Sequence, residues 1–279
     1  MTDPTTLIGA TYAFPPGGMP PLDDSPEGTA RFTTAYAVIP AGTMRDITSS
    51  ALPGWSRTRA WIIARPLSGF AETFAQYAVE LAPGGGSDHP EPDPQAQGAI
   101  LVAKGTGQLH IGDTAHAIGP GSYAYLPPGA RWSLRNPGPE PLQFHWIRKR
   151  YTPAPDTPAP KPLITTDSAT AIRWMPGATD WGTTRFIDPD DLAHDMHVNI
   201  VTFLPGGRIP FAETHVMEHG LYVLQGTARY LLNTDWVEVG PGDFMWLRAF
   251  CPQACIATGD QPFRYLLYKD VNRHPALAP

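Results

Sequence analysis

The sequence predicts an all-β protein made of two antiparallel jelly-roll barrels, and three observations lead to this fold class. Its strand-like segments are short, rich in β-branched or aromatic residues, and bounded by Gly, Pro, Asp or Asn. A glycine-framed pattern occurs twice, beginning at Gly86 and again at Gly207. No segment has a long helical period, and only Pro189–His194 is expected to form a short helical turn. The repeat indicates two similar units, and barrels close their own sheet edges.

The first half of the chain is expected to supply a strap, several strands and one barrel. Residues 1–30 contain many prolines and glycines and no clear period, so we expect a strap or a loose tail there. Residues 1–70 as a whole should pack on the barrels, and residues 71–150 should form the first barrel. The expected strands are Thr34–Ile39, Arg59–Ala64, Thr73–Leu81, Ala99–Ala103, Gln108–Ile111, Ser122–Leu126, Arg131–Leu134 and Leu142–Ile147.

A proline-rich linker at residues 151–165 should connect this barrel to a second one at residues 166–279. Between Thr152 and Pro162 the frequent prolines favour a semi-rigid polyproline-type connector. The strand rhythm then resumes. The expected strands are Met196–Phe203, Leu221–Leu224, Ala228–Leu232, Trp236–Val239, Phe244–Leu247 and Phe263–Lys269.

The second half contains metal-binding residue types inside a glycine frame. The spacing is G-x5-E-x-H-x3-H-x6-G, formed by Gly207, Glu213, His215, His219 and Gly226. Residues two apart on a strand point to the same side, so Glu213 and His215 can converge on one ion. His219 lies one bend further on, and Gln253 would join from another strand. Two imidazoles, a carboxylate and an amide oxygen, without a thiolate, suit Mn(II) or Fe(II), and Zn(II) or Ni(II) also fit.

The same spacing in the first half lacks the ligands. The four equivalent positions are occupied by Pro92, Pro94, Gly98 and Trp132. None of these side chains is a practical metal ligand. The sequence therefore predicts one metal ion per chain, bound in the second barrel only.

These motifs resemble those of the cupin superfamily. Its first motif has the glycine-framed form given above. A second motif is similar to a stretch of the first half that includes Gly121, Pro127, Gly129, Trp132 and Asn136. Two copies make a bicupin, so the resemblance implies the same two-barrel architecture as the repeat.

More narrowly, the second half resembles the (S)-ureidoglycine aminohydrolase family. The similar stretches are Glu213–Gly220, Asn233–Trp236, Gly240–Asp243, Gln253 and Tyr265–Arg273. Glu213 in place of the usual first histidine, and Gln253 in place of the usual last one, separate this family from ordinary cupins. The resemblance implies a Mn-dependent hydrolase of allantoin and purine catabolism. Such an enzyme releases ammonia from (S)-ureidoglycine to give (S)-ureidoglycolate.

Candidate substrate-binding and catalytic residues lie on the neighbouring predicted strands. Tyr265 and Lys269 share one face of a strand, and the resemblance favours substrate contact over a structural tyrosine and lysine. Lys269 could balance a substrate carboxylate or donate a proton to the departing amine, and Glu213 could act beside it through its second oxygen. Gln253 could also touch substrate. Tyr230 is either a core residue or a substrate contact.

Two other classes of function remain open at this point. One is a different metal-dependent cupin enzyme, such as a dioxygenase, decarboxylase or isomerase, but the expected order of three histidines and a glutamate is absent. The other is a non-catalytic bicupin that binds a small molecule. Metal content and ammonia release from ureidoglycine would separate them.

Composition excludes several partners. The net charge of −6 disfavours nucleic acid, and no run of 18 apolar residues predicts a membrane span. We therefore expect a cytoplasmic protein that acts on a small molecule, with no nucleic-acid or membrane partner, and a homo-oligomer. The two cysteines, Cys251 and Cys255, flank Gln253 on one strand face, so they either pack in the core or line the site. Glu218 is expected at the surface, whereas the facing of His197 and Asn199 stays open.

Overall fold

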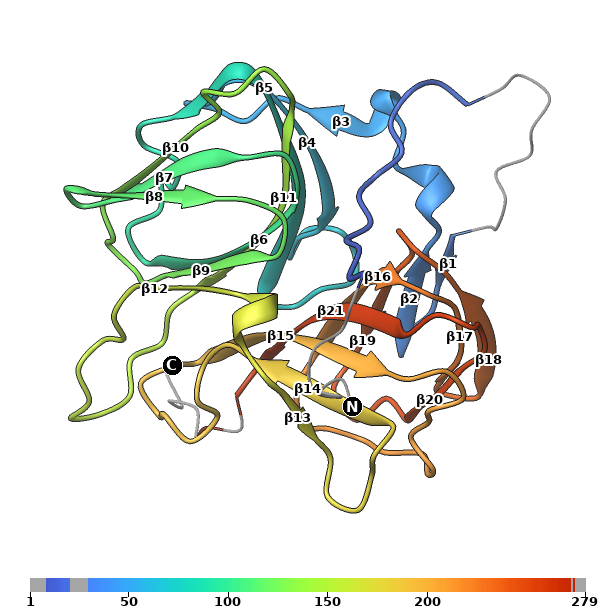
Figure 1. The fold of residues 1–279 in the computed structure, drawn as a ribbon. Helices are drawn as coiled ribbons and strands as arrows, with labels where there is room; N and C mark the ends of the chain where they lie inside the picture. The colour runs from blue at the N-terminus through green and yellow to red at the C-terminus, as the bar shows by residue number, and fades with distance from the viewer. Residues whose placement is uncertain (1–8, 21–29, 272, 274–279) are drawn as a thin grey trace.

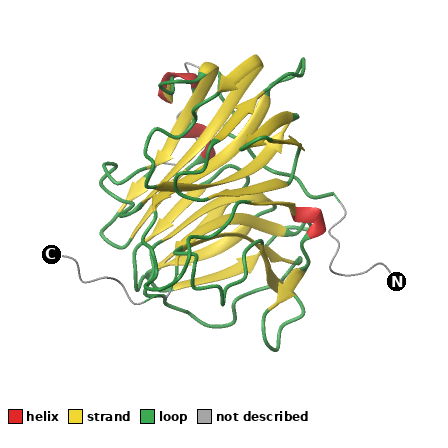
Figure 2. Ribbon diagram, turned by 90° about the vertical axis from the view of Figure 1, so that its left-hand side faces the viewer, coloured by secondary structure: helices red, strands yellow, loops and turns green. Residues whose placement is uncertain are grey.

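The computed structural model describes residues 9–20, 30–271 and 273, and it consists of two β-barrels packed side by side (Figure 1). The predicted all-β fold class is confirmed. In the part of the chain that is described, the helical elements are three short 3-10 turns, η1 (Ala41–Thr43), η2 (Asp46–Thr48) and η3 (Asp167–Ala169). Figure 2 shows the strands of the two barrels stacked one above the other, with loops at their ends.

The first barrel is built around a sheet with the order β12-β9-β6-β11-β5-β10-β7-β8, and β3 and β4 join it through β5. Its strands are β3 (Ser49–Ser50), β4 (Ser56–Ala64), β5 (Phe74–Ser87), β6 (Ala96–Lys104), β7 (Gly107–Ile111), β8 (Thr114–Ile118), β9 (Ser122–Leu126), β10 (Trp132–Arg135), β11 (Leu142–Arg150) and β12 (Leu163–Thr166).

The second barrel combines an eight-stranded sheet, β1-β2-β19-β16-β21-β15-β14-β13, with a three-stranded sheet, β18-β17-β20. Its strands are β1 (Arg31–Phe32), β2 (Tyr36–Ile39), β13 (Ile172–Trp174), β14 (Trp181–Arg185), β15 (Met196–Phe203), β16 (His219–Gln225), β17 (Ala228–Leu232), β18 (Asp235–Val239), β19 (Phe244–Leu247), β20 (Gln253–Ala257) and β21 (Phe263–Asp270).

Two segments cross between the barrels. The N-terminal strand β2 pairs with β19 of the second barrel, although the next strands along the chain, β3 and β4, belong to the first. Conversely, β12 follows the proline-rich segment and pairs back onto β9 of the first barrel. Each barrel is therefore completed by chain from the other side of the linker, which ties the two together.

The prediction of a helical turn at Pro189–His194 is wrong. The segment forms successive turns, in which Asp191 N donates to Asp188 O and His194 N donates to Asp191 O. Proline at the start and an aspartate-rich sequence favour turns, since aspartate side chains bond to nearby backbone N–H groups. Asp188 and Asp191 do this with the backbone N–H groups of Asp190 and Ala193.

Three hydrophobic cores hold the molecule together. One fills each barrel, and the third lies between the barrels, where outward-facing residues of β15, β16 and β21 meet those of β5, β6 and β9. Tyr123 stacks on Phe186 with ring centroids 4.1 Å apart, and Phe74 stacks on Tyr268 at 4.5 Å. Gly220 makes the second stack possible, because a Cβ atom there would lie 2.0 Å from the Tyr268 ring. The outer face of the second barrel is thus buried against the first.

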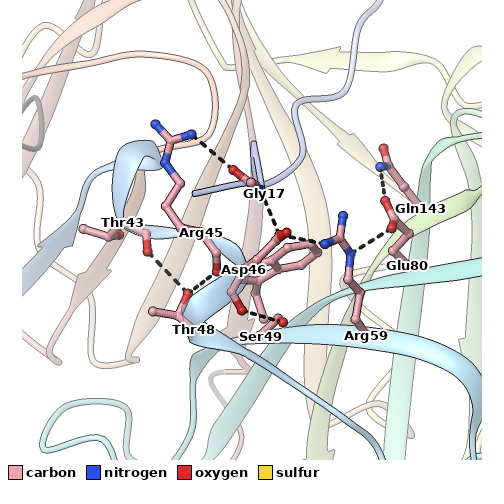
Figure 3. A network of polar contacts seen from close by, with 11 residues as sticks. Gly17, Thr43, Arg45, Asp46, Thr48, Ser49, Arg59, Glu80 and Gln143 are labelled. Carbon is pink, nitrogen blue, oxygen red and sulfur yellow. Dashed lines mark hydrogen bonds and ion pairs between the residues drawn. The ribbon is translucent and has the colours of Figure 1, made fainter. Parts of the chain in front are cut away.

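A polar network fastens the N-terminal segment to the first barrel (Figure 3). Arg59 on β4 donates to Asp46 at 2.6 Å and to Glu80 on β5 at 2.9 Å. Gln143 on β11 donates to the other Glu80 oxygen at 2.6 Å, and the backbone N–H of Gly18 donates to Asp46 at 2.8 Å. Side chains from three strands and the strap therefore share one set of hydrogen bonds.

Candidate metal centre and the adjoining cavity

The four predicted ligands meet at one end of the second barrel. Glu213 and Gln253 form an isolated antiparallel bridge, and each backbone N–H donates to the other's carbonyl at 2.9 Å. Gln253 is the first residue of β20 and His219 is the first residue of β16, so the start of a strand positions each of these two side chains. His215 lies in the loop between Glu213 and His219, where its backbone carbonyl accepts a hydrogen bond from Phe250 N.

The four side chains also contact one another. His215 Nε2 lies 3.4 Å from Glu213 Oε1, and Gln253 Nε2 donates to the same oxygen at 3.3 Å. The imidazole rings of His215 and His219 have centroids 4.9 Å apart. His219 and Gln253 are only 4% and 5% exposed, whereas His215 and Glu213 are half-buried at the opening. The structure thus brings together all four residues that the spacing singled out.

His219 is held as a neutral imidazole. Its Nδ1 lies 3.2 Å from the Met217 carbonyl, which fixes the tautomer with the proton on Nδ1. Burial, with smaller effects from His215 and Lys269, lowers the pKa of His219 to about 3. Nε2 therefore keeps a free lone pair. A ring whose other nitrogen donates to a backbone carbonyl is the usual arrangement for a metal-binding histidine.

Two buried tyrosines lie behind Gln253. The Tyr230 hydroxyl donates to Gln253 Oε1 at 2.9 Å and lies 3.4 Å from the Tyr265 hydroxyl. Burial raises the pKa of both phenols well above the ordinary value, so both stay protonated. Tyr230 packs in the core of the barrel, which was one of the two alternatives expected, and it also orients the Gln253 amide.

Lys269 lies next to this group near the end of β21. It is paired in register with His219 on β16 and with His197 on β15. Burial and, second, the nearby Arg185 guanidinium lower the pKa of Lys269, while the Glu213 carboxylate acts in the opposite direction. Lys269 therefore lies within electrostatic reach of a predicted ligand and has an ammonium group that releases its proton more readily than an exposed lysine.

The donor set fits a divalent cation that prefers nitrogen and oxygen ligands. Two imidazoles, one carboxylate and one amide converge, and the chemistry of His219 is that of a ligand. The arrangement is not a closed ligand shell, however. Within the described residues, no three His, Cys, Asp or Glu side chains are grouped as they would be around an ion. Here Glu213 instead engages His215 and Gln253 directly.

The first barrel has filled the equivalent space with aromatic rings. Gly98 stands where His219 stands in the second barrel, and a Cβ atom at Gly98 would lie 2.8 Å from Trp146 Nε1. Trp132, at the position of Gln253, packs edge-on against Trp146 with centroids 5.7 Å apart, and Trp55 completes the group. The indole rings leave no room for a side-chain ligand at position 98.

Glu218 is buried, and the prediction that it lies at the surface is wrong. Its carboxylate accepts hydrogen bonds from Glu72 N at 2.8 Å, from Thr73 N and Thr73 Oγ1 at 2.7 Å each, and from Trp246 Nε1 at 2.8 Å. Glu218 does point away from the metal side of His219. The side of the chain to which Glu218 points is covered by the first barrel and not by water. The alternation of residues in the sequence shows the side but not what covers it.

His197 and Asn199, whose facing the sequence left open, line a cavity of about 210 Å³ together with Lys269. They alternate along β15 with Met196, Val198 and Ile200, which pack in the core between the barrels. Because strand residues alternate, His197 and Asn199 face the inside of the second barrel. Arg185 and Met217, which lies two residues before His219, also line the cavity, whereas none of the four predicted ligands does.

The two cysteines are buried and unpaired with each other. Cys255 packs in the core of the second barrel, and burial raises the pKa of its thiol well above the ordinary value. The Cys251 Sγ atom lies 3.6 Å from the Pro252 carbonyl, and burial raises its pKa as well. Both are protonated thiols of the core, in keeping with the simpler of the two expectations.

Comparison with known proteins gives consistent results. The cupin domain family matches residues 77–148 and 199–268, one copy in each barrel. The (S)-ureidoglycine aminohydrolase of Escherichia coli (strain K12) is 29% identical over 85% of this chain and 88% of its own length. The enzyme of the same name from Arabidopsis thaliana is 30% identical over 81% and 73%. A crystal structure of a putative glyoxylate induced protein from Pseudomonas aeruginosa is 57% identical, with a TM-score of 0.90 over 97% of this chain and 99% of that one.

No helix among the described residues is long and apolar enough to cross a membrane.

Proposed function

Because the chain belongs to the cupin family, and within it to the family of (S)-ureidoglycine aminohydrolases, we propose that it releases ammonia from (S)-ureidoglycine to give (S)-ureidoglycolate. The reaction belongs to allantoin breakdown in purine catabolism. The observation that carries the proposal is the meeting of Glu213, His215, His219 and Gln253 beside Lys269 at one end of the second barrel.

These four side chains would hold one divalent ion, and we propose Mn(II), with Fe(II), Zn(II) and Ni(II) as weaker alternatives. When bound, the ion supplies positioning of the substrate and stabilisation of developing negative charge. The neutral state of His219 and the protonated state of Tyr230 favour this role. The hydroxyl of Tyr230 is a fixed partner for the Gln253 amide and so limits the rotation of that ligand.

The reaction breaks the bond between the central carbon and the amine and forms a bond from that carbon to a water oxygen. The departing amine needs a proton, and Lys269 would donate it from Nζ. Burial lowers the pKa of Lys269, and this direction suits the role of a proton donor. The water loses a proton in return, and the Glu213 oxygen that does not bind the ion can accept it. The net result is one water consumed and one ammonia released.

Two routes give the same products with these groups. In the first, the ureido nitrogen donates electrons as the amine leaves, and water then adds to the resulting acylimine. In the second, water displaces the amine directly. In either route Tyr265 would anchor a polar end of the substrate, because its protonated hydroxyl lies against Tyr230 inside the barrel.

The test is ammonia release by metal-loaded protein from freshly prepared (S)-ureidoglycine. The expected result is release well above the spontaneous decay of the substrate, abolished in a protein that carries both His215→Ala and His219→Ala. Release no faster than spontaneous decay, in protein shown to hold its metal, would contradict the proposal and leave a small-molecule-binding role.

A further inference from the structure

The cavity beside Lys269 contains polar groups that the reaction described above does not use. His197 and Asn199 are 6% and 3% exposed, so both side chains are almost fully withdrawn from solvent. His197 Nε2 and Asn199 Oδ1 nevertheless have no hydrogen-bond partner among the residues that the structure describes. A buried polar atom without a partner is costly, and such atoms in a native fold call for an explanation. Both residues line the same cavity of about 210 Å³.

The cavity also adjoins the proposed reaction centre. Lys269 forms part of its wall and is paired in register with His197 on one side and His219 on the other. Met217, whose carbonyl lies 3.2 Å from His219 Nδ1, forms another part of the wall. The cavity is therefore connected to the candidate metal centre through Lys269 and Met217, while the four predicted ligands themselves lie outside its lining.

We propose that this cavity binds the ureido group of the substrate, with Asn199 Oδ1 accepting a hydrogen bond from a ureido N–H and His197 Nε2 bonding to the same group. The inference rests on the proposed function, and it assigns the end of the substrate that does not react. His197 and Asn199 are then specificity-determining residues that distinguish a ureido acid from other small carboxylic acids.

The chemistry of the cavity matches this group. A ureido group presents N–H donors and one carbonyl acceptor, and it is uncharged. Asn199 Oδ1 can only accept, so it selects for an N–H donor. Burial, followed by the charge of Lys269, lowers the pKa of His197 to about 4, so the imidazole is neutral at pH 7 and complements an uncharged group. The cationic Arg185 and Lys269 at the wall favour the carboxylate at the other end of the same molecule.

Two stable ligands test the assignment in metal-loaded protein by calorimetry. N-carbamoylglycine keeps the carboxylate and ureido group of the substrate and lacks only the reactive amine. N-acetylglycine has a methyl group in place of the terminal ureido NH₂. We expect N-carbamoylglycine to bind about 10-fold or more tightly, because N-acetylglycine leaves a buried acceptor unpaired. Equal affinities for the two ligands in the wild-type protein would overturn the assignment without any variant.

The variant Asn199→Leu keeps the size of the side chain and removes the acceptor. In this variant the ratio of the affinities for N-carbamoylglycine and N-acetylglycine should fall toward one, while metal content stays the same. The matched control is Thr184→Val on the neighbouring strand β14. Thr184 is also buried with an unpartnered Oγ1, but it lies opposite Ile200 and faces the core between the barrels, so its loss should leave the preference unchanged. A similar weakening of both ligands in Asn199→Leu would show that the cavity does not recognise the ureido end.

Ammonia release from (S)-ureidoglycine, measured on the same preparation, keeps the two proposals apart. Discrimination between the two ligands without ammonia release would retain the ureido cavity and defeat the aminohydrolase reaction. Normal ammonia release with no discrimination would do the reverse.

Discussion

Glu218 in the second barrel accepts two hydrogen bonds from Thr73 in the first, one from the backbone N–H and one from the hydroxyl, both at 2.7 Å. Glu218 directly precedes His219, the first residue of β16. The strand that carries this predicted ligand is therefore held to the first barrel at its beginning. The first barrel has Pro92, Pro94, Gly98 and Trp132 at the positions of the four predicted ligands, and this contact gives it a direct structural link to the candidate centre in the second.

We expect Glu218→Gln to destabilise the folded protein by about 1–3 kcal/mol, because an amide presents N–H donors to backbone and indole N–H groups that need an acceptor. Metal affinity should fall as well, since His219 loses its support. Urea unfolding and a metal titration measure the two effects. The control is Glu238→Gln on β18, whose carboxylate is exposed and forms an ion pair with Arg229 at 3.3 Å. Equal stability of the two variants would show that the buried carboxylate contributes nothing.

Metal content should be one divalent ion per chain. The protein that carries His215→Ala and His219→Ala should bind none and remain folded, because the first barrel has the same architecture with packed aromatic rings in place of the ligands. Elemental analysis and circular dichroism provide the measurements. His110→Ala with His116→Ala, on β7 and β8 of the first barrel, should keep the full metal content. Two ions per chain, or an ion that survives the loss of both second-barrel histidines, would contradict the single site.

Lys269→Met should retain the metal and lose turnover by roughly 10²-fold or more, as expected when a positioned proton donor is removed. A lysine that served only to pack its alkyl chain would leave the rate of ammonia release nearly unchanged. The control Lys104→Met, at the exposed end of β6, should behave like wild type. Steady-state kinetics on metal-replete protein decides between the two roles of Lys269.

Stability should decrease in mild acid because of His145. Burial lowers the pKa of this ring to about 4 in the folded protein, against 6.5 for an unburied histidine, and its Nε2 lies 3.0 Å from the Ala13 carbonyl. Between these two pH values the unfolded chain binds a proton that the folded chain excludes. The contribution of His145 to the free energy of unfolding is therefore fully present above pH 6.5. It is lost as the pH falls toward 4, by about 3 kcal/mol at most.

The variant His145→Phe should flatten this part of the pH profile, since phenylalanine cannot bind the proton and His145 already packs against Phe14 and Tyr222. Urea unfolding at several pH values measures the difference in the free energy of unfolding between the two proteins. The contributions of the other histidines are the same in both and cancel in this difference. An identical pH dependence in wild type and variant would rule out His145 as the source.

The glycine-framed spacing was sufficient to predict that Glu213, His215 and His219 come together, although His215 lies in a loop and not on the strand that the alternation argument assumed. Gln253 was found through its place in the repeat, where it stands opposite Trp132. The prediction that the first barrel binds no metal rests on the residue types at Pro92, Gly98 and Trp132. The aromatic packing of Trp55 and Trp146 could not be predicted, since it depends on contacts between strands distant in sequence. Local sequence likewise shows which residues share a strand face, but it does not show what covers that face.

Two residues illustrate this limit. Glu218 alternates with His219 as expected, yet its side is covered by Thr73 of the other barrel. Asn199 lies on β15, which is buried on both faces, so alternation alone does not show what lies on its side, and only the assembled barrel shows that it borders the cavity.

The handedness and rate of product formation test the central claim most directly. Protein loaded with Mn(II) and given (S)-ureidoglycine should release one ammonia per substrate, leave the carbamoyl group in place, and form ureidoglycolate of a single hand. A substrate fixed between the four ligands, Lys269 and the barrel wall exposes only one face of its central carbon to water. Racemic ureidoglycolate, or ammonia release no faster than spontaneous decay in metal-replete protein, would contradict the account.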